Sequence, residues 1–125
     1  MAVPTSVFRA MAYGDPYPVK AFFVLGNNAL MSYANMQLIQ RAILTQDLVV
    51  AVEHFKTPTA QLADYILPGD AWLERNALSD SFGWTSIYRT SQKTVDPPGE
   101  CRSVYDFWRG LAVRLDLGEY FRGLT

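Results

Sequence analysis

The sequence predicts an α/β fold in which helices pack on a mostly parallel sheet. Two runs, Phe22–Leu25 and Leu48–Val52, contain only apolar side chains and are rich in β-formers, a pattern typical of parallel strands covered on both faces. Between them, residues 35–44 place apolar side chains at helical spacing. A connection of this length predicts that the two strands are parallel neighbours joined by a right-handed crossover.

The composition is that of one ordinary globular domain. A chain of 125 residues, of which 50% are hydrophobic and 18% charged, is long enough for one core, so we predict a single domain over residues 1–125. The net charge of -1 arises from 11 basic and 12 acidic residues in no long block. This balance argues against a nucleic-acid surface and against a polybasic membrane patch.

The hydropathy pattern gives no sign of a membrane segment. No apolar run approaches the roughly 20 residues that span a bilayer, and the N-terminus lacks the basic-then-apolar order of a secretory signal. We expect a soluble segment without membrane insertion, for which the cytoplasm is the favoured compartment.

Metal-ligating residues are scarce in this chain. Cys101 is the only cysteine and His54 the only histidine, which excludes an intrachain disulfide, a cysteine cluster for iron and sulfur, and an all-cysteine zinc site. Carboxylates would have to supply most ligands of a metal centre, and they show no convergent spacing. We therefore expect no metal ligand and no catalytic residue here, and we favour a surface or partly packed imidazole for His54.

The segment before the first strand is poorly patterned. Residues 1–18 hold some apolar side chains at helical spacing, but Gly14, Pro16 and Pro18 interrupt them. We predict an N-terminal arm there, followed by a strand–helix–strand core over residues 19–68.

Beyond the second strand, the core continues with two short elements. Pro58 suits the first turn of a short helix over residues 58–62, with Thr57 as its N-cap. Residues 64–67 then have the composition of a third strand, which the following proline and glycine close.

The C-terminal part has two predicted elements. Residues 84–95 mix β-branched and aromatic side chains with polar ones, which predicts an extended or hairpin-like excursion. Ser103 is a suitable N-cap for a helix over residues 103–117, and Gly118 follows its end.

The end of each long strand carries polar residues. Gly26 permits a sharp turn after the first strand, and Asn27 and Asn28 tolerate left-handed conformations while offering amide donors and acceptors. Glu53 ends the second strand at the carboxyl edge, where open α/β sheets bind ligands. It is placed to accept hydrogen bonds from a ribose or from the N–H edge of a guanine. Two interpretations remain for the turn: a nucleotide-phosphate turn, or an ordinary strand-to-helix loop.

Three separated blocks of sequence are similar to one protein family. They are FFVLGNNAL at residues 22–30, TPTAQLADYILPGDAWLE at residues 57–74 and DPPGECRSVYDFW at residues 96–108. In this order they resemble the strand and Gly-x-Asn turn, the Thr-x-Thr-Ala…Leu-Pro segment and the Pro-Pro-Gly-Glu segment of the molybdopterin oxidoreductases, of the dimethyl sulfoxide reductase and formate dehydrogenase type.

This resemblance implies a fold, a cofactor and a set of contacts. It implies a Rossmann-like three-layer domain that holds one of two molybdopterin guanine dinucleotides on a metal, a site described as bis-MGD binding. Glu53 would contact the guanosine, and the turn would face the pterin or the pyrophosphate. The implied cofactor-binding residues are Gly26, Asn27, Asn28, Glu53, His54, Thr57 and Thr59.

The resemblance covers a small part of such an enzyme. We expect a fragment of a molybdenum or tungsten oxidoreductase that has the remaining domains of its parent as partners and is inactive alone. The alternative is a free-standing nucleotide-binding or protein-interaction module that kept the fold without redox activity. A dinucleotide-dependent dehydrogenase is disfavoured, because no Gly-x-Gly-x-x-Gly follows either strand.

Overall fold

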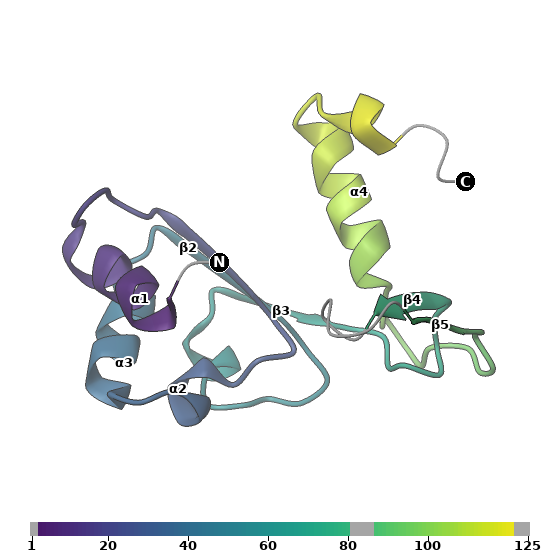
Figure 1. Ribbon diagram of the computed structural model, residues 1–125, viewed down its shortest axis with the longest axis horizontal. Coiled ribbons are helices and arrows are strands. Elements are labelled where there is room, and N and C mark those ends of the chain that lie inside the picture. The colour runs from purple at the N-terminus through teal and green to yellow at the C-terminus, as the bar shows by residue number, and fades with distance from the viewer. Residues whose placement is uncertain (1–2, 81–86, 122–125) are drawn as a thin grey trace. The chain divides into compact units, whose positions relative to one another are not determined.

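The computed structural model describes residues 3–80 and 87–121 of the chain (Figure 1). The chain divides into two compact units, Met1–Leu67 and Pro68–Thr125, and the single domain over residues 1–125 stays a prediction. The buried apolar residues are concentrated in the first unit, whereas Ala112 is the one buried apolar residue described in the second.

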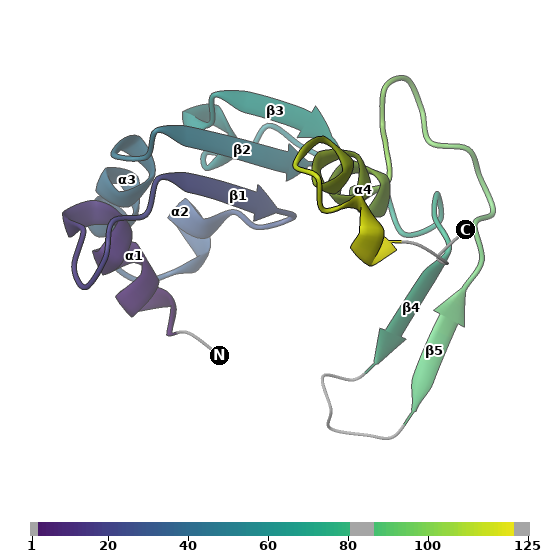
Figure 2. The same cartoon turned by 90° about the horizontal axis from the view of Figure 1, so that it is seen from above.

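The first unit is built around a parallel sheet. Its strands are β1 (Ala21–Leu25), β2 (Leu48–Glu53) and β3 (Tyr65–Pro68), in the order β1-β2-β3, and all three run in the same direction (Figure 2). Successive residues of β2 are buried from Val49 to Glu53, so this central strand is covered on both faces. The predicted α/β fold with a parallel sheet is confirmed; the Rossmann-like three-layer arrangement stays a prediction.

Helices α1 (Pro4–Tyr13) and α3 (Met36–Leu44) pack against one another beside this sheet (Figure 1). The Asn35 side chain caps α3 by accepting a hydrogen bond from the N–H of Leu38 at 3.1 Å. A one-turn helix, α2 (Ala29–Ser32), connects β1 to this region. The core cluster of the unit is made by Phe8, Met11, Ala12, Ala29, Ile39, Ala42, Ile43 and Val49.

Helix α1 occupies the segment for which the sequence predicted an N-terminal arm. Pro4 lies in its first turn, where proline is tolerated. Gly14 ends the helix in a left-handed conformation and donates its N–H to the carbonyl of Ala10 at 2.8 Å. The glycine and the prolines after it are therefore stop signals that follow a helix.

The second unit contains a hairpin and a helix. Strands β4 (Ala77–Asp80) and β5 (Tyr88–Ser91) pair antiparallel; β5 lies within the predicted excursion over 84–95, of which residues 84–86 are outside the described residues. Helix α4 (Val104–Arg114) begins after Ser103, whose hydroxyl accepts a hydrogen bond from the N–H of Tyr105 at 3.2 Å. A 3-10 turn, η2 (Gly118–Phe121), follows.

The helices of the described part of the chain are too short or too polar to cross a membrane.

Candidate functional site

The carboxyl ends of β1 and β2 lie side by side. In the parallel register Leu25 is the partner of Val52, and the N–H of Gly26 donates to the carbonyl of Val52 at 2.9 Å. The turn after β1 is therefore adjacent to Glu53, the last residue of β2. The structure brings these two sequence-predicted features together at one edge of the sheet, where ligands of open α/β sheets bind.

Glu53 is a buried carboxylate with an unmet hydrogen-bonding capacity. Its exposed fraction is 9%, and its Oε1 atom is buried without a hydrogen-bond partner among the described residues. Leaving a buried charged acceptor unpaired is costly. At this edge Glu53 Oε1 is therefore a buried acceptor whose hydrogen-bonding capacity is unused by the described residues.

The turn after β1 depends on its glycine. Gly26 has φ of +55°, a conformation that L side chains rarely adopt. A Cβ atom at this position would meet no atom within 4 Å, so the chain leaves open space beside the turn. Within the described part of the structure, the backbone N–H groups of Asn27 and Asn28 donate to no acceptor.

Asn28 and Thr59 are joined in an internal network. The Oδ1 atom of Asn28 accepts hydrogen bonds from the hydroxyl of Thr59 at 2.8 Å and from its backbone N–H at 3.4 Å. The Thr59 hydroxyl oxygen accepts in turn from the N–H of Leu30 at 2.9 Å, and Thr59 is fully buried. These side chains brace the turn after β1 against the loop after β2.

Thr57 and His54 follow Glu53 in this loop. The Thr57 hydroxyl accepts a hydrogen bond from the N–H of Ala60 at 3.2 Å. The 3-10 turn η1 (Ala60–Leu62) lies within the predicted helix over 58–62, and Thr59, where Thr57 was predicted, is its N-cap residue. The imidazole of His54 is exposed. Across residues 3–80 and 87–121, no group of three His, Cys, Asp or Glu side chains is arranged to hold a metal ion.

A match to a family model identifies the protein family of this chain. Residues 4–114 match the model described as molybdopterin oxidoreductase. The chain belongs to the molybdopterin oxidoreductase family.

Relatives of this molybdopterin oxidoreductase segment are much longer proteins. Acetylene hydratase of Syntrophotalea acetylenica is 54% identical over 121 residues, which are 97% of this chain and 17% of that protein. The molybdopterin-containing subunit of thiosulfate reductase of Salmonella typhimurium is 33% identical over 95% of this chain and 16% of its own length. The chain thus spans about a sixth of the length of these curated relatives.

A solved structure shows the same fold. Acetylene hydratase from Pelobacter acetylenicus matches 97% of this chain and 17% of its own, with a TM-score of 0.87 and 54% sequence identity.

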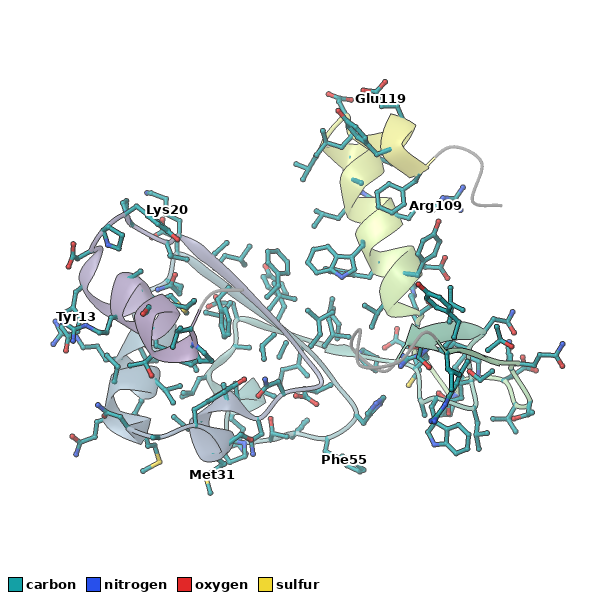
Figure 3. All side chains as sticks on the ribbon, in the orientation of Figure 1. Tyr13, Lys20, Met31, Phe55, Arg109 and Glu119 are labelled. Atoms are coloured by element: carbon teal, nitrogen blue, oxygen red, sulfur yellow. The ribbon has the colours of Figure 1, made fainter. Side chains whose placement is uncertain are left out.

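Sequence reasoning missed one side chain at this edge. Tyr33 follows α2, and its hydroxyl oxygen accepts a hydrogen bond from the Nδ2 atom of Asn27 at 3.2 Å. Its spacing from the Gly26 turn matches no motif, because the path of the chain through α2 decides where the phenol lies. Phe55, after β2, projects outward and is 78% exposed (Figure 3).

A separate cavity lies between α1 and α3. It has a volume of about 540 Å³ and shares no residue with the carboxyl edge of the sheet. The Arg41 guanidinium stands over the Tyr13 ring at 4.7 Å from its centroid, and Tyr13 is exposed at this end of the unit (Figure 3). The lining residues are Thr5, Arg9, Tyr13, Asn35, Gln37, Leu38 and Arg41.

Proposed function

We propose that this chain contributes part of the binding site for one molybdopterin guanine dinucleotide in a longer molybdenum or tungsten oxidoreductase. The observation that carries the proposal is the unpartnered, buried carboxylate oxygen of Glu53 beside the Gly26 turn. Membership of the family supports the cofactor class. The remaining domains of the parent would supply the metal ligand, the redox centre and the substrate site, so this chain alone is not catalytic.

The chemistry of Glu53 fits a guanine base. The Watson–Crick edge of guanine carries two neighbouring N–H donors, at N1 and at the exocyclic amine, and an ionised carboxylate accepts at both oxygens. Adenine presents an unprotonated nitrogen acceptor at the corresponding ring position and would leave part of the carboxylate unpaired. Glu53 therefore gives this edge a preference for guanine over adenine.

The chemistry of the turn fits phosphate oxygens. The unpaired N–H groups of Asn27 and Asn28 are donors, and consecutive backbone donors of this kind form concave anion sites. The open space at Gly26 leaves room for a group to approach the backbone. The cofactor, when bound, supplies the dithiolene sulfurs that hold the metal, and the role of this chain is to bind and orient its nucleotide end.

The side chains of Asn28 and Thr59 are hydrogen-bonded within the chain, which favours a positioning role for them over the cofactor contacts that the family resemblance implies. Their oxygen atoms are engaged with one another and with the N–H of Leu30. We propose that these two side chains position the turn, and that Gly26, Asn27, Glu53 and the backbone N–H of Asn28 make the contacts. His54 and Thr57 belong to the same loop and complete the edge of the proposed site.

A nucleotide titration tests this function. The 125-residue chain is labelled with ¹⁵N and titrated with GMP and with AMP, while amide shifts are followed. A few hydrogen bonds of about 0.5–1.5 kcal/mol each give a dissociation constant on the order of 1 mM. GMP should perturb residues 26–28 and 53–57 more than AMP does.

Variants of Glu53 sharpen this test. Glu53→Ala removes the acceptors, and Glu53→Gln replaces one acceptor by an N–H donor, so both should abolish the preference for GMP. Glu100→Ala removes an exposed carboxylate of the second unit and should leave the preference intact. Equal shifts with GMP and AMP in the unmodified chain, or shifts scattered over both units, would refute the proposed role of Glu53.

A further inference from the structure

We propose that Tyr33 is a second anion-binding residue of this edge, donating its hydroxyl hydrogen to a phosphate oxygen of the nucleotide held at the Gly26 turn. This inference rests on the proposed function and adds a residue to it. In this arrangement Glu53 selects the base, and Tyr33 binds the phosphates together with Asn27.

The hydroxyl hydrogen of Tyr33 is available as a hydrogen-bond donor. The Tyr33 oxygen accepts from the Nδ2 atom of Asn27 at 3.2 Å, and a tyrosine hydroxyl has one hydrogen of its own to donate. Within the described residues that hydrogen has no acceptor. Because Tyr33 is 37% exposed, the hydroxyl can reach a ligand from the solvent side.

The hydrogen bond from Asn27 also makes the Tyr33 hydroxyl a stronger donor. A hydroxyl that accepts a hydrogen bond becomes a better donor, since neighbouring hydrogen bonds strengthen one another. The amide of Asn27 retains a second N–H, and its backbone N–H is unpaired within the described chain. Asn27 and Tyr33 together present several donors, which suits the multiple oxygens of a phosphate or pyrophosphate.

The ring of Tyr33 is held in place before any ligand arrives. It packs against the ring of Phe8 with centroids 5.7 Å apart, and Phe8 is a core residue of α1 with an exposed fraction of 6%. The backbone N–H of Tyr33 donates to the carbonyl of Ala29 at 3.3 Å. A donor fixed in this way loses little conformational freedom on binding.

The experiment uses inorganic pyrophosphate as the probe, because it carries the proposed ligand chemistry without a base. The ¹⁵N-labelled chain, Tyr33→Phe and Tyr17→Phe are each titrated, and the shifts of residues 26–28 give the dissociation constants. Tyr33→Phe keeps the ring on Phe8 and removes only the hydroxyl. It should weaken pyrophosphate binding about threefold to tenfold, the ratio expected for one hydrogen bond.

Tyr17→Phe is the matched control, because Tyr17 is an exposed tyrosine of the same unit and is not part of the proposed site. It should bind pyrophosphate as the unmodified chain does. Thermal unfolding of Tyr33→Phe separates binding from structure: a lower midpoint with unchanged pyrophosphate affinity would show a purely structural hydroxyl and overturn the proposal.

The two proposals fail in different ways. Retention of the GMP preference with equal pyrophosphate affinity in Tyr33→Phe would overturn the role of Tyr33 and leave that of Glu53 intact. Loss of pyrophosphate affinity in Tyr33→Phe without any preference for GMP in the unmodified chain would support Tyr33 and refute Glu53. Absence of pyrophosphate-induced shifts at residues 26–28 in the unmodified chain would overturn the phosphate site itself.

Discussion

The two units differ in how they bury their apolar side chains. In the first unit, β2 is buried from Val49 to Glu53 and α3 buries Ile39 and Ile43 almost completely. In the second unit, α4 has the helical spacing of an amphipathic helix, yet only Ala112 of this helix is buried. Secondary structure is present in both units, but a substantial apolar core is present in the first.

This difference shows that helical spacing and burial are separate properties. The spacing of apolar residues decides which face of a helix can be buried, whereas burial needs a second apolar surface opposite that face. Helix α1 supplies such a surface to α3 through Phe8 and Met11.

The largest effect is expected from truncating a core residue of α3. Ile39 has no exposed surface, so Ile39→Ala removes buried methyl groups and leaves a cavity. The free energy of unfolding of the first unit should fall by about 2–5 kcal/mol. Urea unfolding, followed through the amide signals of β2 and of α4 separately, measures the effect on each unit.

The controls for this change lie on the same helix and on α4. Leu44→Ala alters a side chain of α3 that is 61% exposed, and Val113→Ala alters one of α4 that is 58% exposed. Each should change the free energy of unfolding by less than about 0.5 kcal/mol. A cost at Val113 equal to that at Ile39 would mean that α4 has a core of its own, and the comparison of the units would be wrong.

An intermediate effect on stability is expected at the Thr59–Asn28 hydrogen bond, which joins the loop after β2 to the turn after β1. Thr59→Val preserves the side-chain shape but leaves Asn28 Oδ1 and the N–H of Leu30 without their side-chain partner. The loss should be about 1–3 kcal/mol, the cost of unpaired buried polar groups, measured by thermal unfolding. Thr59→Ser keeps the hydroxyl and should lose only about 0.8 kcal/mol for the missing methyl group; equal losses in the two variants would argue against the brace.

The smallest effect is expected at an exposed ion pair of the second unit. Lys93 Nζ lies 2.7 Å from Asp96 Oδ1, and the hydrogen bond and charge of Lys93 lower the pKa of Asp96 below its ordinary value. Lys93→Gln should raise the pKa of Asp96 toward that value, as read from the pH titration of its carboxyl carbon by NMR. Lys56→Gln, which changes a lysine of the first unit, should leave that titration unchanged.

The sign of the linked stability change follows from this shift. A carboxyl whose pKa is lower in the folded than in the unfolded chain contributes stability above its unfolded pKa and loses it as the pH falls through the folded pKa. Because Asp96 is fully exposed, solvent screens the pair and the change in stability should be too small to detect. A measurable acid destabilisation that disappears in Lys93→Gln would contradict this expectation.

Much of the first unit could be predicted from local patterns. The runs Phe22–Leu25 and Leu48–Val52 were recognisable as covered strands because a strand buried on both faces has no polar alternation. The proximity of Gly26 and Glu53 also followed, since parallel neighbours place their carboxyl ends together. Helix α1 was not predicted within the arm over residues 1–18, because Gly14, which interrupts the apolar spacing, marks the end of that helix.

Residue type and spacing alone indicate the two long strands, the connecting helix and the polar character of the sheet edge. Which polar atoms of that edge already have hydrogen-bond partners depends on how the chain folds. Thr59 and Asn28 pair with one another, whereas Glu53 Oε1 has no partner within the described residues. The physical reason is that hydrogen bonds need distances near 3 Å and defined directions, which side-chain identity leaves open and the packed chain sets.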